Sequence, residues 1–354
     1  MRKFFLIPSL IFATYCMAQT EVTEYVPGLN AEGVTYFLPQ TVVDITIETE
    51  KVTYTPGEFC NYANKFLRTQ GISNKPDTHW NIKRIEIALA GIADPNKAFT
   101  IKLKDKSIAS LVKLAEDGVL LSINAAQESG NKKGNDKDTE TIHSSKQLNP
   151  KELLSEEILS ATSTAKMAEL VAREIYNIRD SRNSIIRGQA DNMPKDGEAL
   201  KLILKNLDEQ EAALISMFEG TTETEQRTLV ARLTPGNENQ TKQILFRFSR
   251  LLGVVDADDL SGAPIYYDIE NLTNLPQPDE KSLKKAKRPQ GVVYNLPGKA
   301  LLRIYQNSEV LYEEEIPVAQ YGQTDVLANE LFNKGVDTKI TFDPATGGIR
   351  KIDR

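Results

Sequence analysis

The stretch Val43-Asp-Ile-Thr-Ile-Glu48 decides the fold of the N-terminal third of this 354-residue chain. Its apolar and polar side chains alternate, which is typical of a β-strand with one buried face. The same period of two returns at Phe99–Leu103, and Asp117-Gly118 before another apolar run is a strong hairpin signal. These patterns predict a β-rich N-terminal domain over residues 19–125.

Two local features refine the expected structure of this domain. The parity of the apolar positions changes between Ile82 and Ile85, which predicts a β-bulge near Lys83 or Arg84. A short helix ended by Gly71 is also expected. Its apolar stripe at helical spacing comprises Phe59, Tyr62, Ala63, Phe66 and Leu67.

The hydrophobic period changes to about 3.6 residues across residues 151–220. Two apolar stripes carry this period: Met167, Leu170, Val171, Ile175 and Ile178, and then Leu200, Ile203, Leu204, Leu207, Leu214 and Phe218. Pro194 suits the first turn of a helix, and Gly220 suits the position after a helix end. We therefore expect an α+β fold in which β-rich N- and C-terminal regions flank a long antiparallel helical hairpin.

The remaining segments are assigned from their composition. Residues 126–150 hold few large apolar side chains, which predicts a flexible polar linker. The turn Pro235-Gly236-Asn237 between apolar runs predicts a β-hairpin region over residues 221–275. A basic linker at 276–290 is expected to lead into a C-terminal β domain at 291–354.

The first 18 residues have the pattern of a secretory signal peptide. Arg2-Lys3 precedes a short apolar run, and small side chains lead to Ala18. Cleavage after Ala18 is expected. The alternative is a lipoprotein anchored at Cys16, which the bulky Tyr15 disfavours. The protein is therefore expected to be exported.

Composition excludes several classes of protein. After cleavage Cys60 is the single cysteine, so no intramolecular disulfide can form. The net charge of −6 gives no general attraction to nucleic acid. No later run approaches the roughly 18 apolar residues of a membrane span, so the mature chain is not expected to span a membrane.

Histidine and cysteine give little support for nucleophilic catalysis. The only histidines are His79 and His143, and the sequence has no Gly-x-Ser-x-Gly or His-Glu-x-x-His motif. A thiol nucleophile at Cys60 would need His79 as its base, whereas a buried structural cysteine is the commoner case. We therefore assign no catalytic, cofactor-binding or metal-binding residue, and no cofactor.

Carboxylates are harder to dismiss, because acid pairs hydrolyse glycosidic bonds without histidine. The best candidates are Asp256, Asp258 and Asp259, which follow an apolar run. Their spacing does not fit an EF-hand loop, and a solvated turn with capping Asp side chains is expected. Glu209 and Glu211, on the polar face of the second expected helix, are expected to be solvated.

Six stretches of the chain resemble an uncharacterised family of exported Bacteroidetes proteins, a domain-of-unknown-function family. They are YTPGEFC at 54–60, LLSIN at 120–124, ADNMPKDGEA at 190–199, LFRFSR at 245–250, GVVDADDL at 253–260 and TFDP at 341–344. The resemblance spans nearly the whole mature chain. It implies a Gram-negative, periplasmic setting and brings no catalytic residues.

These observations favour an exported, non-enzymatic binding or scaffold protein of the cell envelope, periplasmic or envelope-associated. The helical hairpin would present the surface for its partner, an envelope protein or a glycan. The alternative is a carboxylate-dependent hydrolase that acts on glycan or peptidoglycan. A hydrolase should place two acids about 5–10 Å apart in a concave pocket, whereas a scaffold should expose an apolar stripe or an open sheet edge.

Overall fold

The fold is taken from a computed structural model of the full chain. The structure describes residues 21–24, 33–102, 112–125, 141–143, 148–190, 196–274, 291–328 and 338–353. The expected signal peptide, the expected basic linker at 276–290 and most of the expected polar linker lie outside the described residues.

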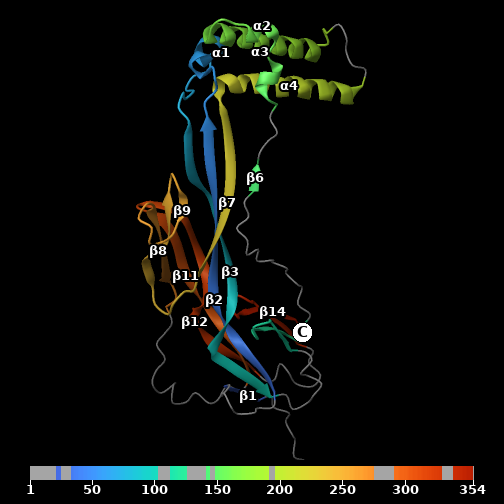
Figure 1. The fold of residues 1–354 in the computed structure, drawn as a ribbon. Helices are drawn as coiled ribbons and strands as arrows, with labels where there is room; N and C mark the ends of the chain where they lie inside the picture. Colours follow the sequence, from blue (N-terminus) through green and yellow to red (C-terminus); the bar gives the residue numbers. More distant parts are fainter. Residues whose placement is uncertain are drawn as a thin grey trace, which may run out of the picture.

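Three antiparallel sheets make up most of the described chain (Figure 1). The first, here called the long sheet, has the strand order β1 (Glu21–Glu24), β3 (Asp77–Lys102), β2 (Val34–Thr55), β7 (Thr221–Leu233) and β6 (Thr141–His143). The stacked sheet has the order β12 (Glu309–Ala328), β11 (Gly291–Gln306), β10 (Ala263–Asn271), β8 (Gln240–Ser249) and β9 (Gly253–Val255). The small sheet has the order β14 (Ile349–Asp353), β13 (Lys339–Phe342), β5 (Leu120–Ile123) and β4 (Val112–Leu114).

Strand β2 forms the centre of the long sheet, as its alternating sequence predicts. Val43, Ile45 and Ile47 are fully buried and pack against the inner face of the stacked sheet. In the pairing of β2 with β3, Glu48 faces Arg84 and the next residue faces Ile82. Lys83 is therefore the extra residue of a bulge, which confirms the predicted irregularity.

The expected α+β class is wrong, and so is the expected division of the chain by a long antiparallel helical hairpin. Strands account for 52% of the chain and helices for 24%. The helices are short beside the strands: 23 helical residues rise about 35 Å, whereas the 26 residues of β3 span about 86 Å. Local periodicity could not reveal that β7, which follows the helices, pairs with β2, which precedes them. The strands on either side of the helices thus form one sheet instead of two flanking regions.

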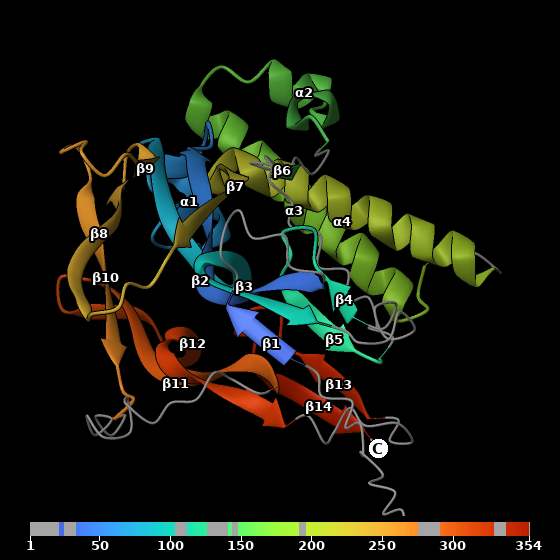
Figure 2. The ribbon, with the colours of Figure 1, turned by 90° about the horizontal axis from the view of Figure 1, so that it is seen from below.

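The N-terminal and C-terminal parts of the chain also contribute strands to one sheet and side chains to one core cluster. In the small sheet, Ile340 of β13 pairs with Ile123 of β5. Tyr36, Leu38 and Tyr294 belong to one buried cluster together with Ile340. Figure 2, seen from below, shows β8, β10 and β11 along one side of the molecule and the small sheet on the other.

The helices cap the far end of the long strands (Figure 1). They are η1 (Cys60–Tyr62), α1 (Ala63–Leu67), η3 (Pro150–Leu153), α2 (Glu156–Leu159), α3 (Thr164–Ile186) and α4 (Gly197–Glu219). The predicted short helix is confirmed by η1 and α1, although it ends at Leu67, where Arg68 with φ of +62° caps it, before Gly71. Ser163 and Asp196 cap α3 and α4 through their side chains.

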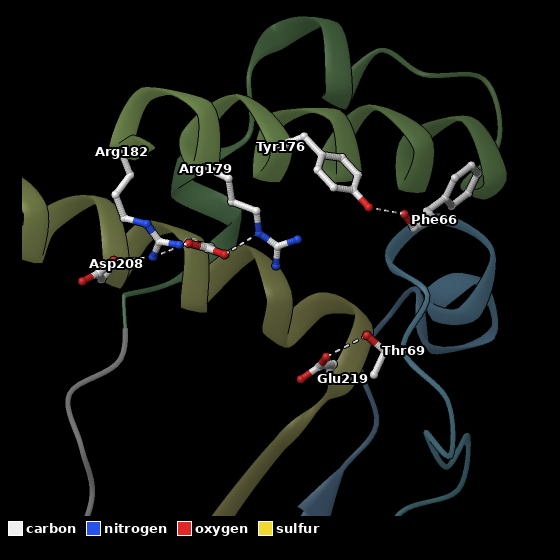
Figure 3. Close-up of polar contacts among 8 residues, drawn as sticks. Phe66, Thr69, Tyr176, Arg179, Arg182, Asp208 and Glu219 are labelled. Atoms are coloured by element: carbon white, nitrogen blue, oxygen red, sulfur yellow. Dashed lines mark hydrogen bonds and ion pairs between the residues drawn. The ribbon is translucent and has the colours of Figure 1, made fainter. Parts of the chain in front are cut away.

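Polar contacts join α4 to α3 and to the segment around α1 (Figure 3). The prediction that Glu211 is solvated is wrong. Its side chain is buried. Oε1 of Glu211 accepts a hydrogen bond from Nε of Arg179 at 2.7 Å, and Oε2 lies 3.1 Å from Nη1 of Arg182. Tyr176 donates to the carbonyl of Phe66 at 3.0 Å. Helix periodicity marks the polar face of α4 but does not indicate that a neighbouring helix covers part of that face.

Candidate functional site: the pocket at Trp80

A pocket of about 430 Å³ lies between the long sheet and the loop that joins β8 to β9 and β10. Trp80 on β3 and Arg227 on β7 line it, and both strands are positioned by pairing with β2. Apolar side chains from β7, β8 and β9 line the rest: Leu229, Leu245, Phe246, Val254 and Val255. This lining, with a few polar groups, is typical of a binding pocket.

Trp80, the single tryptophan of the chain, is a packed wall of this pocket. Its residue surface is only 6% exposed, and the guanidinium carbon of Arg227 lies 5.0 Å from the ring centroid, within cation–π range. Gly253 has φ of +83°, and a Cβ there would lie 3.0 Å from the indole. The backbone N–H of Trp80 donates to the carbonyl of Arg250 at 2.7 Å. The indole is therefore fixed and has little surface left for stacking on a sugar.

The cationic side chains beside the pocket pair with one carboxylate, that of Glu225. Arg227 donates to Glu225 Oε1 through Nε at 3.0 Å and through Nη2 at 2.7 Å. Lys51 Nζ lies 3.4 Å from the other oxygen of the same carboxylate. The hydrogen bond from Arg227 holds the pKa of Glu225 below its usual range, and Lys51 adds to that effect.

The loop at residues 250–262 is held by hydrogen bonds to its backbone. Arg247 donates from Nε to the carbonyl of Ala257 at 2.7 Å and from Nη1 to the carbonyl of Gly262 at 3.1 Å. Asp259 accepts from the backbone N–H of Ser261 at 2.9 Å. This bond, aided by the charge of Arg247, lowers the pKa of Asp259.

Three leucines of this loop point into solvent. Leu251 is 74% exposed, Leu252 is 58% exposed and Leu260 is 82% exposed. Leu252 also lines the pocket. Three largely exposed leucines within thirteen residues of one held loop exceed the singly scattered apolar side chains of an ordinary surface.

The three candidate acids lie on the same loop. Asp256 lines the pocket, whereas Asp258 and Asp259 are exposed on the turn beside it. Asp259 caps a backbone N–H, as expected for a solvated turn. Among the described residues that line the pocket, Asp256 is the only carboxylate, so the acid pair that a glycoside hydrolase needs is not assembled there.

A family model with the description "Domain of unknown function (DUF4831)" matches residues 32–350. The chain belongs to this family. The resemblance to a domain-of-unknown-function family is thereby confirmed, and the family carries no activity that could be transferred. Neither a curated protein nor a solved structure matches the chain. In the part of the chain that the structure describes, no helix has the length and apolar character required to cross a membrane.

The histidines and the cysteine considered from the sequence are not brought together into one site by the fold of the described residues. His79 Nδ1 lies 2.8 Å from Asp77 Oδ2, and no hydrogen bond between described residues joins His79 to Cys60. His143 lies in β6, whose backbone pairs with β7. Within the described ranges, no group of three or more His, Cys, Asp or Glu side chains is placed to hold a metal ion.

Sequence reasoning missed the contact between Trp80 and Arg227. Strand β2 lies between β3, which carries Trp80, and β7, which carries Arg227. Thr49 of β2 is 178 residues away from Arg227 in the sequence. The local signal for Arg227 is that of an ordinary strand residue, and only the pairing of β2 with β7 brings it to the indole.

Proposed function

We propose that this chain is an exported binding protein of the cell envelope that docks a protein partner on its leucine loop, without catalysing a reaction. The leucine loop is defined here as residues 250–262. The observation that carries the proposal is the exposure of Leu251, Leu252 and Leu260 on a loop fixed by hydrogen bonds beside an apolar pocket.

Burial of these leucines would supply the free energy of association. A fully buried leucine side chain contributes about 1.5–3 kcal/mol relative to an exposed one. Because Arg247 already holds the loop, little conformational entropy is lost when a partner binds. An apolar side chain of the partner would fit the adjoining pocket, between Leu252 and the β-strands.

The proposed setting is the periplasm or envelope of a Gram-negative bacterium. It is supported by the basic, apolar and small-residue pattern that ends at Ala18. N-terminal sequencing of the native protein should find Gln19 as the first residue. Retention of Met1, or a lipid on Cys16, would contradict this part of the proposal.

A carboxylate-dependent hydrolase acting on glycan or peptidoglycan is the second candidate. One observation favours it: Asp268 and Glu270 of β10 line the same hollow on the outward face of the stacked sheet. Because they are two positions apart on a strand, their side chains share a face.

The test of the proposed docking is a photo-crosslinking residue placed at Leu251 in the full chain, exposed to envelope extract. It should yield a discrete protein adduct. The matched control is the same probe at Leu202, a leucine of α4 that is 59% exposed. The further change Leu260→Asp should abolish the adduct at Leu251 without changing the melting temperature.

Equal adducts from both probe positions, or an adduct at Leu251 that survives Leu260→Asp, would show that the loop is not the docking site. Circular dichroism of each variant confirms that the fold is retained.

A further inference from the structure

We propose that the outward face of the stacked sheet binds a neutral glycan, at a platform formed by Tyr266, Asp268, Arg303 and Tyr305. This platform lies on β10 and β11. It shares no residue with the leucine loop, so the two proposals stand independently.

An aromatic and apolar row crosses this face. Tyr266 pairs with Tyr305 across β10 and β11, and their rings stack with centroids 5.7 Å apart and planes 29° apart. Ile244 of β8 pairs with Tyr266, and Val310 of β12 pairs with Tyr305. Both flanking side chains are exposed. The row therefore offers a continuous apolar strip against which the C–H face of a sugar ring can pack.

A charged row runs beside the aromatic one. Asp268 pairs with Arg303, and Arg303 pairs with Glu313 on β12. Asp268 Oδ1 accepts from the backbone N–H of Lys242 at 2.6 Å and from the hydroxyl of Tyr305 at 3.1 Å. Arg303 donates from Nε to Glu313 at 2.5 Å. These contacts fix the planes of both side chains.

The same contacts leave hydrogen-bonding capacity on the platform. Among the described residues, no hydrogen bond uses Oδ2 of Asp268 or the two terminal nitrogens of Arg303. A carboxylate acceptor and a guanidinium donor thus lie side by side on adjacent strands. Neighbouring sugar hydroxyls, each both a donor and an acceptor, match that pair.

The shape of the face favours a chain of small units over one compact ligand. Two hollows of about 240 and 230 Å³ adjoin here, and both are lined by Asp268 and Arg303. Each is smaller than the roughly 300 Å³ at which pockets for drug-sized ligands begin. An oligosaccharide could place successive sugar rings in the two hollows, with the glycosidic bond between the rings over Asp268 and Arg303.

The charge of the platform argues for a neutral glycan. Asp268, Glu270 and Glu313 line the hollows, and Arg303 is the only cationic side chain among the described lining residues. The ammonium of Lys242 lies 5.9 Å from the Tyr266 ring, so carboxylates still outnumber cations. A sulfated or phosphorylated polymer would be repelled by this excess of negative charge.

The test is calorimetric titration of the full mature chain with short neutral oligomers of glucose and of N-acetylglucosamine. At least one series should bind, with affinity that rises with chain length. Tyr305→Ala and Asp268→Asn should each weaken binding about tenfold or more, the scale of one lost hydrogen bond or packing contact. Leu260→Asp should leave the glycan affinity unchanged.

The matched control is Tyr176→Ala, which removes an exposed tyrosine of α3 far from the platform. It should bind like the wild type. The proposal is overturned if the folded wild-type chain binds none of these oligomers, if Tyr176→Ala weakens binding as much as Tyr305→Ala, or if a sulfated oligomer binds more tightly than its neutral counterpart. Thermal melts of each variant establish that it is folded before titration.

Discussion

The carboxylate of Glu211 lies 2.7 Å from Nε of Arg179, so α4 and α3 are joined by an ion pair whose carboxylate is largely removed from solvent. Arg182 reaches the other oxygen of Glu211 at 3.1 Å and also contacts Asp208 at 2.8 Å. The two arginines lie one helical turn apart on α3 and fix which residues of α4 face them. Figure 3 shows both arginines directed toward α4.

Replacement of Glu211 by Ala should lower the free energy of unfolding by about 1–3 kcal/mol, because hydrogen bonds to two cations are lost. The control is Glu209→Ala, which removes an exposed glutamate of the same helix and should change stability by about 0.5 kcal/mol or less. Urea unfolding followed by circular dichroism measures both. A loss at Glu209 equal to that at Glu211 would show that the contacts of Glu211 with the two arginines make no specific contribution to stability.

Leu214→Ala should cost about 2–5 kcal/mol, since Leu214 is fully buried in the cluster that joins α3, α4 and η1. Ile203 belongs to the same predicted stripe but is 38% exposed, so Ile203→Ala should cost less than half as much. Thermal or urea unfolding compares the two variants. Equal losses would show that the outer part of α4 is as buried as the part near the strands.

Gly253→Ala should destabilise the chain and shift the emission of Trp80 to longer wavelength, because the added methyl group meets the indole. Gly71→Ala is the matched control: it also has positive φ, +79°, but has nothing within 4 Å. It should cost only about 1 kcal/mol of backbone strain and leave the emission unchanged. Since Trp80 is the single tryptophan, steady-state fluorescence reports on the pocket alone.

Glu225→Gln should reduce stability at pH 7 and lose this effect in acid. The pKa of Glu225 is lower in the folded chain than in the unfolded chain, so its ionised form stabilises the fold above the unfolded pKa. That contribution disappears as the pH falls through the lowered pKa of Glu225. Urea unfolding at several pH values should show the gap closing, while the exposed neighbour Glu223→Gln stays within about 0.5 kcal/mol of wild type. A stability difference between wild type and Glu225→Gln that grows as the pH falls would contradict the lowered pKa of Glu225.

Turnover assays separate the proposed binding function from the hydrolase. We expect no hydrolysis of envelope glycan or peptide by the purified chain. If turnover occurs and Asp256→Asn, Asp258→Asn, Asp259→Asn or Asp268→Asn lowers it by about two orders of magnitude or more, without loss of fold, the hydrolase replaces the binding protein. A turnover that survives all four changes, and Glu270→Gln as well, would point to a contaminating enzyme.

Features set by neighbouring residues were predictable from the sequence. The alternation at Val43, Ile45 and Ile47, the bulge at Lys83 and the short helix ending at Leu67 each depend on a few consecutive positions. Their signal is a period in the side chains, which the backbone geometry of a strand or helix imposes directly.

Features that join distant segments were not predictable. The pairing of Glu48 with Thr228, and the pairing of Ile123 with Ile340, combine strands that no local pattern relates. The wrong fold class and the wrong environment of Glu211 share this cause. The Trp80 pocket depends on the pairing of β2 with β7, and the tyrosine platform depends on the pairing of β10 with β11. Neither pairing is marked by a local pattern, so neither site could be singled out from the sequence.

The central position of β2 sets the order in which the chain can fold. Val43, Ile45 and Ile47 appear early in synthesis, yet the strands that cover them extend from β8 to β12. Because such distant contacts close slowly, folding should be limited by the search for them. Until residue 318 is available, the apolar face of β2 has only a partial cover, so a shortened chain is prone to aggregate through that face.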